Sequence, residues 1–228
     1  MGSKGANTRT MSDSHDSQLA PKNLQSSNLQ PVRRTRKPRA DRRIEILKTV
    51  ATLLADPKVD RITTAQIARE LSLSEAALYR IFISKADIYL GLLDLMEGSV
   101  IEVFDRIAAD PVLPATNDRV RTMVRALLDF GTANPGFARV FAGQVFLGED
   151  ERLMQRLALV FDKFEATFRQ RYREGVMAGE LPADFNTTAK ANLIMSWVIG
   201  RWTRYAVTGF KGARPNDVSA TAVEALLA

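Results

Sequence analysis

The spacing of apolar residues constrains the fold of this chain most strongly. From Arg43 onward, large apolar side chains recur with the period of an α-helix almost everywhere, and no segment alternates apolar with polar residues as a half-buried strand would. The first such series comprises Ile44, Leu47, Val50, Ala51 and Leu54. We therefore expect an all-α protein.

Capping residues and prolines divide this pattern into separate helices. The first helix should end at Asp56-Pro57. The next three should each begin after a capping hydroxyl, at Thr63, Ser74 and Ser84, because a Ser or Thr oxygen can accept a hydrogen bond from a backbone N–H of the first turn. The fourth helix should extend toward Ala109. Further helices are expected near residues 117–133, 135–147, 150–178, 186–208 and 216–227.

Residues 64–81 carry the most informative spacing. Counted from Thr64, apolar residues occupy the fourth, eighth, tenth, fifteenth and eighteenth places, and the small Ala68 occupies the fifth. Two short helices that cross steeply can share a core only when a small residue allows close approach and larger residues fill the angle. The ninth place favours glycine in a left-handed conformation, and here it is Ser72, which can adopt that conformation at modest cost. The pattern predicts a helix-turn-helix; the alternative is an ordinary pair of core helices.

A helix-turn-helix inserts its second helix, which here is the third of the chain, into the major groove of DNA. Leu78, Ile81 and Phe82 should face the core. The residues left to face DNA are Ser74, Glu75, Ala76, Tyr79 and Arg80. Contacts with phosphate oxygens are expected from Arg61, Thr63, Thr64 and Lys85. For Arg80 and Lys85 a solvated surface position remains the alternative.

Positive charge is concentrated at the N-terminal end. The chain has a net charge of +6, but residues 1–43 hold ten cations and three anions, so the remainder is close to neutral. The densest basic run contains Arg33, Arg34, Arg36, Lys37 and Arg39. A polar segment with few large apolar residues is expected to be disordered, and a basic arm beside a folded domain commonly follows a phosphate backbone. The alternative is a solvated tail that aids solubility.

Three parts follow from these patterns: a disordered basic arm over residues 1–39, a DNA-binding head over 40–85 and a helical dimerisation and regulatory body over 86–228. The composition argues against catalysis. The chain has no Cys and a single His, His15, and no nucleophile stands beside a base. We expect no enzyme, cofactor, metal site or membrane span, and the absence of Cys fits a reducing cytoplasm.

The residues of the head resemble those of the TetR family of bacterial DNA-binding proteins. The resemblance rests on Ile62-Thr63-Thr64, on Ser74 through Arg80, and on Phe82 with Ser84-Lys85. The usual His-Phe-Pro-Ser-Lys of the family is replaced by Ile81-Phe82-Ile83-Ser84-Lys85, which keeps the core Phe and the phosphate-binding Lys. The resemblance implies a three-helix head joined to a larger helical body.

A narrower resemblance, over about residues 40–228, is to the nucleoid occlusion factors of that family. It includes four body motifs: Phe130-Gly131 with Asn134-Pro135-Gly136, Asp150 through Leu153, Phe210-Lys211 and Arg214-Pro215. It implies a cytoplasmic, nucleoid-associated homodimer on palindromic double-stranded DNA, which inhibits the tubulin-like division protein FtsZ and needs no small-molecule inducer. Val103, Asp129 and Ala133 give the expected partner surface little basic character for an acidic tail of FtsZ.

The helix near residues 186–208 is too apolar to bury only one face. We expect it to contribute to a four-helix dimer interface, with Trp197 and Trp202 as anchors. Met195 and Leu226 are expected to join them. The alternative is that these residues belong to the core of a single chain.

A ligand-responsive repressor of the TetR type is the alternative function. In such a repressor a ligand in the body changes the spacing of the two DNA-binding heads. An internal cavity lined by these aromatic and Met side chains would favour the repressor, and tight packing there would favour the first hypothesis: Phe104, Met123, Phe137, Phe141 and Phe164.

Overall fold

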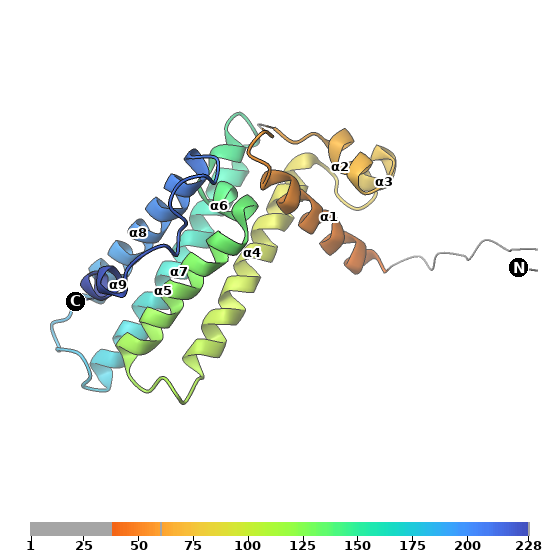
Figure 1. Cartoon of the computed structure of the whole chain (residues 1–228). Coiled ribbons are helices and arrows are strands. Elements are labelled where there is room, and N and C mark those ends of the chain that lie inside the picture. The colour runs from red at the N-terminus through yellow and green to blue at the C-terminus, as the bar shows by residue number, and fades with distance from the viewer. Residues whose placement is uncertain (1–37, 60, 228) are drawn as a thin grey trace, which may run out of the picture. The chain divides into compact units, whose positions relative to one another are not determined.

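The computed structural model describes residues 38–59 and 61–227, which lie within one compact unit, Lys37–Ala228. Within these residues the chain forms α-helices and one short 3-10 helix and contains no strand, which confirms the expected all-α class (Figure 1). The elements are α1 (Arg39–Leu54), α2 (Thr64–Glu70), α3 (Glu75–Tyr79), α4 (Lys85–Ala108), α5 (Thr116–Ala133), α6 (Pro135–Phe141), η1 (Gln144–Phe146), α7 (Arg152–Met177), α8 (Thr187–Val207) and α9 (Ala220–Leu227).

The caps of the head form as predicted. The hydroxyl oxygens of Thr63, Ser74 and Ser84 each accept a hydrogen bond of 3.1 Å from the backbone N–H three residues later. Ser72 has φ 53°, the left-handed conformation expected at the turn between α2 and α3. These local interactions begin α2, α3 and α4 and set the angle between the two helices of the motif.

The buried face of α1 agrees with the prediction at Leu47, Val50 and Leu54 and differs from it at one edge. Ile46 is completely buried together with Leu47, Val50 and Leu54, whereas Ile44 is 42% exposed. The reason is that α1 packs against α2, α4 and α6, which cover a stripe centred on Leu47, Val50 and Leu54. The spacing alone indicates an apolar face, and the neighbouring helices decide which edge of it is covered.

The body consists of the long helices α4, α5, α7 and α8, with α6 and α9 packed against them. The helix expected over residues 135–147 was wrong in extent. It ends at Phe141, because Gly143 takes a left-handed conformation with φ 73°, and η1 follows as a separate turn. The last helix likewise begins at Ala220 and not near residue 216.

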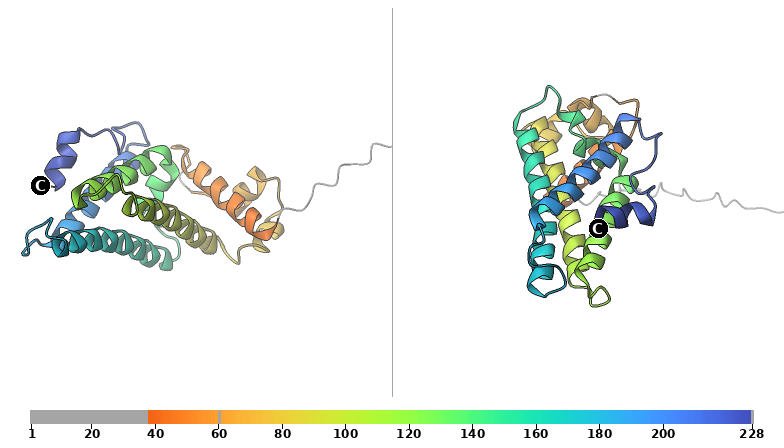
Figure 2. Two further views of the ribbon diagram at one scale, coloured as in Figure 1. Left: turned by 90° about the horizontal axis from the view of Figure 1, so that it is seen from below. Right: turned by 90° about the vertical axis from the view of Figure 1, so that its left-hand side faces the viewer.

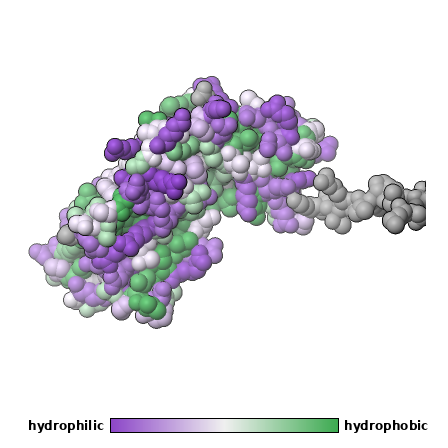
Figure 3. Space-filling model, in the orientation of Figure 1, coloured by the Kyte–Doolittle hydropathy of each residue, from purple (hydrophilic) through white to green (hydrophobic). Residues whose placement is uncertain are grey.

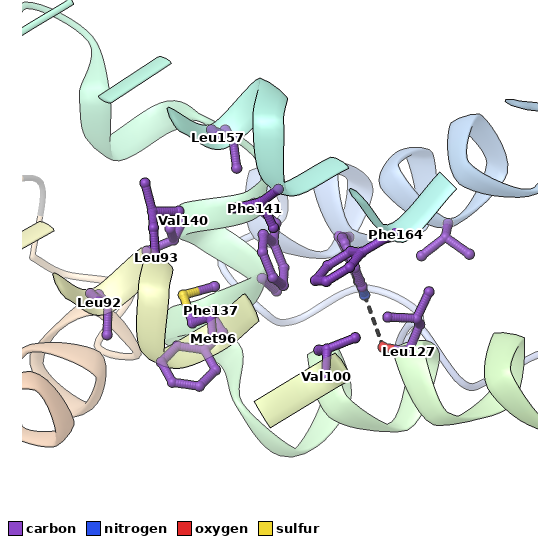
Figure 4. Packing of buried hydrophobic residues seen from close by; sticks show 14 of the residues in the cluster. Leu92, Leu93, Met96, Val100, Leu127, Phe137, Val140, Phe141, Leu157 and Phe164 are labelled. Atoms are coloured by element: carbon purple, nitrogen blue, oxygen red, sulfur yellow. Dashed lines mark hydrogen bonds between the residues drawn. The ribbon is translucent and has the colours of Figure 1, made fainter. Parts of the chain in front are cut away.

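Aromatic residues pack among aliphatic ones in the core of the body (Figure 4). Trp202 has no exposed surface, stacks on Phe141 at 4.4 Å between ring centroids and donates from Nε1 to the carbonyl of Leu127 at 3.2 Å. The same indole lies where a Cβ atom on Gly131 would stand. Glycine at this position of α5 therefore allows α5 and α8 to approach closely.

The short helix α6 joins the body to the head. A Cβ atom on Gly136 would collide with the backbone carbonyl of Ala51 in α1, so only glycine permits this approach. The buried guanidinium of Arg139 donates to the carbonyls of Asp56 and Val59, at 3.1 and 2.8 Å, in the segment after α1. Gly136 is therefore a packing requirement that, together with Arg139, holds the head against the body.

Candidate nucleic-acid interface

The third helix presents a polar surface beside α2. Ser74, Glu75, Ala76, Tyr79 and Arg80 are all exposed. Their neighbours Leu78 and Phe82 are buried and Ile81 is half-buried, so the predicted division between the core face and the free face is present. In Figure 3 hydrophilic residues lie among hydrophobic ones at this end of the described unit. The arrangement matches the requirement that a recognition helix keep one face free for base edges.

Hydrogen bonds between α2 and α3 organise part of this surface. The hydroxyl of Thr64 donates to Oε2 of Glu75 at 2.7 Å, and the hydroxyl of Tyr79 donates to Oγ1 of Thr64 at 3.4 Å. The proton of the Thr64 hydroxyl is thus directed at a carboxylate, whereas the Thr63 hydroxyl accepts from the backbone N–H of Gln66 and keeps its own proton available. Thr63 is the better placed of the two to donate to a phosphate oxygen.

Two cations expected at phosphates lie against a loop of the body. Nζ of Lys85 forms an ion pair of 2.5 Å with Oε1 of Glu149, in the segment between η1 and α7. The guanidinium of Arg61 lies 3.5 Å from where a Cβ atom on Gly148 would stand. Tyr89 packs beside this pair, and burial together with the charge of Glu149 raises its pKa to about 12. A phosphate that binds Lys85 would therefore compete with Glu149.

Only Arg39 among the expected residues of the basic arm lies within the described part of the chain. It is the first residue of α1, and its Nη2 donates to the carbonyl of Arg80 at 3.3 Å, at the C-terminal cap of the recognition helix. The other expected residues of the arm lie outside the described residues: Arg33, Arg34, Arg36 and Lys37.

The structure contradicts most of the expected dimer contacts. Trp202 and Met195 are buried within the chain, and Leu226 of α9 is buried in the same core. A side chain that its own chain encloses cannot contact a partner, so their selection as interface anchors was wrong. Trp197 is half-buried and remains accessible on the outer side of α8.

Residues 38–59 and 61–227 contain neither a candidate metal site nor a candidate membrane span. No group of three or more His, Cys, Asp and Glu side chains is placed to hold a metal ion there. None of the helices described there is both long enough and apolar enough to cross a membrane.

Comparisons with known proteins identify the family. Residues 115–222 match the family model SlmA-like_C, a tetracyclin repressor-like C-terminal domain. The chain is 37% identical over 174 residues to the nucleoid occlusion factor SlmA of Shewanella sediminis, which covers 76% of this chain and 87% of the relative. The chain belongs to the SlmA family. A second SlmA, from Colwellia psychrerythraea, is 35% identical over 193 residues, covering 85% of this chain and 92% of the relative.

Solved structures place the SlmA-family chain within the TetR fold. The transcriptional regulator FadR from Bacillus subtilis, solved with stearoyl-CoA, superposes with a TM-score of 0.69 at 15% identity and covers 81% of this chain and 97% of its own. A cysteine mutant of the TetR family regulator CifR, solved with 26-bp operator DNA, has a TM-score of 0.63 at 17% identity, covering 80% of this chain and 93% of its own. At these identities the likeness shows the fold alone.

Proposed function

We propose that this chain acts as a nucleoid occlusion factor in the cytoplasm. It binds palindromic double-stranded DNA on the nucleoid as a homodimer and, while bound there, inhibits assembly of the FtsZ ring. It binds its partners without catalysing a reaction. The observation that carries the proposal is the free face of α3, whose exposed residues lie on a capped helix-turn-helix in a chain of the SlmA family.

The outer side of α8 supports a dimer. Leu193 is 51% exposed there, Trp197 is half-buried, and the Cβ position of Gly200 has no atom of the described residues within 4 Å. No described residue requires glycine at this position, and a glycine there would let a partner helix approach closely. Because α7 lies beside α8, joined to it by a hydrogen bond of 3.2 Å from Asn192 to Glu165, two copies can form a four-helix interface (Figure 2). Two-fold symmetry then favours a palindromic site.

The packing of the body favours a function without a small-molecule inducer. Phe104, Met123, Phe141 and Phe164 are buried, and Phe137 nearly so. Within the described residues, the cavity that Phe104 lines has a volume of about 20 Å³, room for about one water molecule. Edge-to-face contacts of Phe164 with Phe104 and Phe141, with centroids 6.0 and 6.2 Å apart, occupy the space that a ligand would need. This tight packing supports the first hypothesis over a ligand-responsive repressor.

The remaining cations complete the proposed DNA contact. Arg80 reaches a base or a phosphate from the exposed end of α3, and Thr63 and Arg61 flank it on the phosphate backbone. We propose that the basic arm follows the phosphates next to the site, which adds affinity without reading sequence.

The test combines mapping in cells with a reconstituted assay. Chromatin immunoprecipitation should find many sites over the chromosome and none near the replication terminus. Purified FtsZ polymerised with GTP should then pellet less in the presence of the chain and a duplex taken from those sites. A scrambled duplex and Arg80→Ala should both restore pelleting. A single site beside one promoter, with no effect on FtsZ, would show a local repressor instead.

A further inference from the structure

We infer that Glu75 is a specificity-determining residue that selects cytosine at one symmetric position of each half-site. The inference rests on the DNA binding proposed above and deepens it by naming a base. Glu75 places a carboxylate on the recognition helix α3. Negative charge is unfavourable there, because the phosphates of DNA surround a helix that enters the groove.

Glu75 stands at the position of α3 that comes closest to bases. It is the first residue of the helix, directly after the cap Ser74, and its side chain is exposed. The N-terminal residues of a recognition helix are those that contact base edges. A carboxylate at this position therefore lies among base edges once the helix enters the groove.

The carboxylate is held in one orientation before DNA binds. The Thr64 hydroxyl from α2 donates to Oε2, and Tyr79, one turn along α3, donates in turn to Thr64. Among the residues that the structure describes, Oε1 accepts no hydrogen bond and no cation forms an ion pair with Glu75. One oxygen is thus positioned by the protein, and the other is free to accept from outside it.

The chemistry of the major groove then selects the base. An ionised carboxylate only accepts hydrogen bonds, and the major-groove donors are the amino groups N4 of cytosine and N6 of adenine. In adenine the neighbouring N7 is an acceptor and repels a second carboxylate oxygen. Guanine and thymine offer only acceptors at these edges. Cytosine is the base that gives Glu75 a donor without an adjacent acceptor.

This assignment predicts opposite effects on affinity and on selectivity. Removing the carboxylate removes repulsion from phosphates, so binding to unrelated DNA should become tighter. Discrimination at one base pair of each half-site should be lost at the same time. A carboxylate that merely stabilised the head would show neither the gain nor the position-specific loss.

The experiment is selection from a library of randomised duplexes with the full-length dimer, followed by affinity measurement on single-base variants of the selected site. Wild type should prefer cytosine at one symmetric position by roughly tenfold to a hundredfold. Glu75→Ala should lose that preference alone, and Glu75→Gln should shift it toward adenine, which a Gln amide can contact through N6 and N7. Thr64→Val, which leaves the carboxylate but frees its orientation, should weaken the preference in part.

Glu70→Gln is the matched control, because it neutralises an exposed carboxylate at the end of α2, outside the recognition helix. It should keep the wild-type site. Equal melting temperatures of wild type and Glu75→Gln would show that the head is folded. The inference fails if Glu75→Gln and Glu75→Ala keep every wild-type preference. A wild-type protein with no preferred sequence would overturn the proposed DNA reading itself, and with it this inference.

Discussion

The recognition helix α3 and helix α8 both carry side chains that were predicted to contact another molecule. On α3 these side chains are exposed, whereas on α8 most of them are buried. The five-residue α3 buries only Leu78 and leaves its predicted contacts exposed. In contrast, α5, α6, α7 and α9 pack against one side of α8 and bury Trp202 and Met195. A short helix at the edge of a domain has one covered side, so exposure follows from spacing. For a long helix inside a bundle, apolar content alone does not identify an interface.

The most severe test of this contrast is Trp202→Ala. Because the indole is completely buried on Phe141 and Gly131, its removal should lower the free energy of unfolding by about 3–5 kcal/mol. Urea denaturation followed by circular dichroism, at two protein concentrations, measures the loss. If Trp202→Ala instead became monomeric with an unchanged free energy of unfolding, Trp202 would be a dimer contact and not a core residue.

Leu193→Glu, on the outer side of α8, should weaken dimerisation and leave the fold intact, the opposite of Trp202→Ala. A carboxylate placed in an apolar contact between two copies should raise the dimer dissociation constant by more than about tenfold. Since Leu193 is half-exposed in the single chain, the helical signal should hardly change. Analytical ultracentrifugation reads the association state. Val112→Glu, at an exposed residue between α4 and α5, is the control and should remain dimeric.

The smallest expected effect concerns the ion pair between the head and the body. Glu149→Gln removes the carboxylate that pairs with Lys85. The Lys85 ammonium can then bind a DNA phosphate without first losing an ion pair. A partly exposed pair contributes about 0.2–1 kcal/mol, so affinity for the DNA site should rise roughly twofold to fivefold. Fluorescence anisotropy over a salt series measures it. Glu151→Gln, at an exposed carboxylate of the same segment, should leave affinity unchanged. Weaker binding of Glu149→Gln would mean that the pair positions Lys85 for DNA.

The sequence predicted the head in more detail than the body. The caps at Thr63, Ser74 and Ser84 and the left-handed Ser72 depend on residues within one turn, and all of them are present. The break after Phe141 was missed, because the single Gly143, which takes a left-handed conformation, lies inside an otherwise helical pattern. Spacing is a local property, whereas the end of a helix also depends on what lies beyond it.

The sequence by itself therefore determined the helical class, the helix-turn-helix and the exposed face of α3, since these follow from interactions within a few residues. Tertiary structure alone decided that Glu149 reaches Lys85, that Gly136 lies on Ala51 and that Trp202 fills the core. These partners lie far apart along the chain. Their contacts depend on the angles and distances at which whole helices cross, which the packing of all the side chains between them sets together.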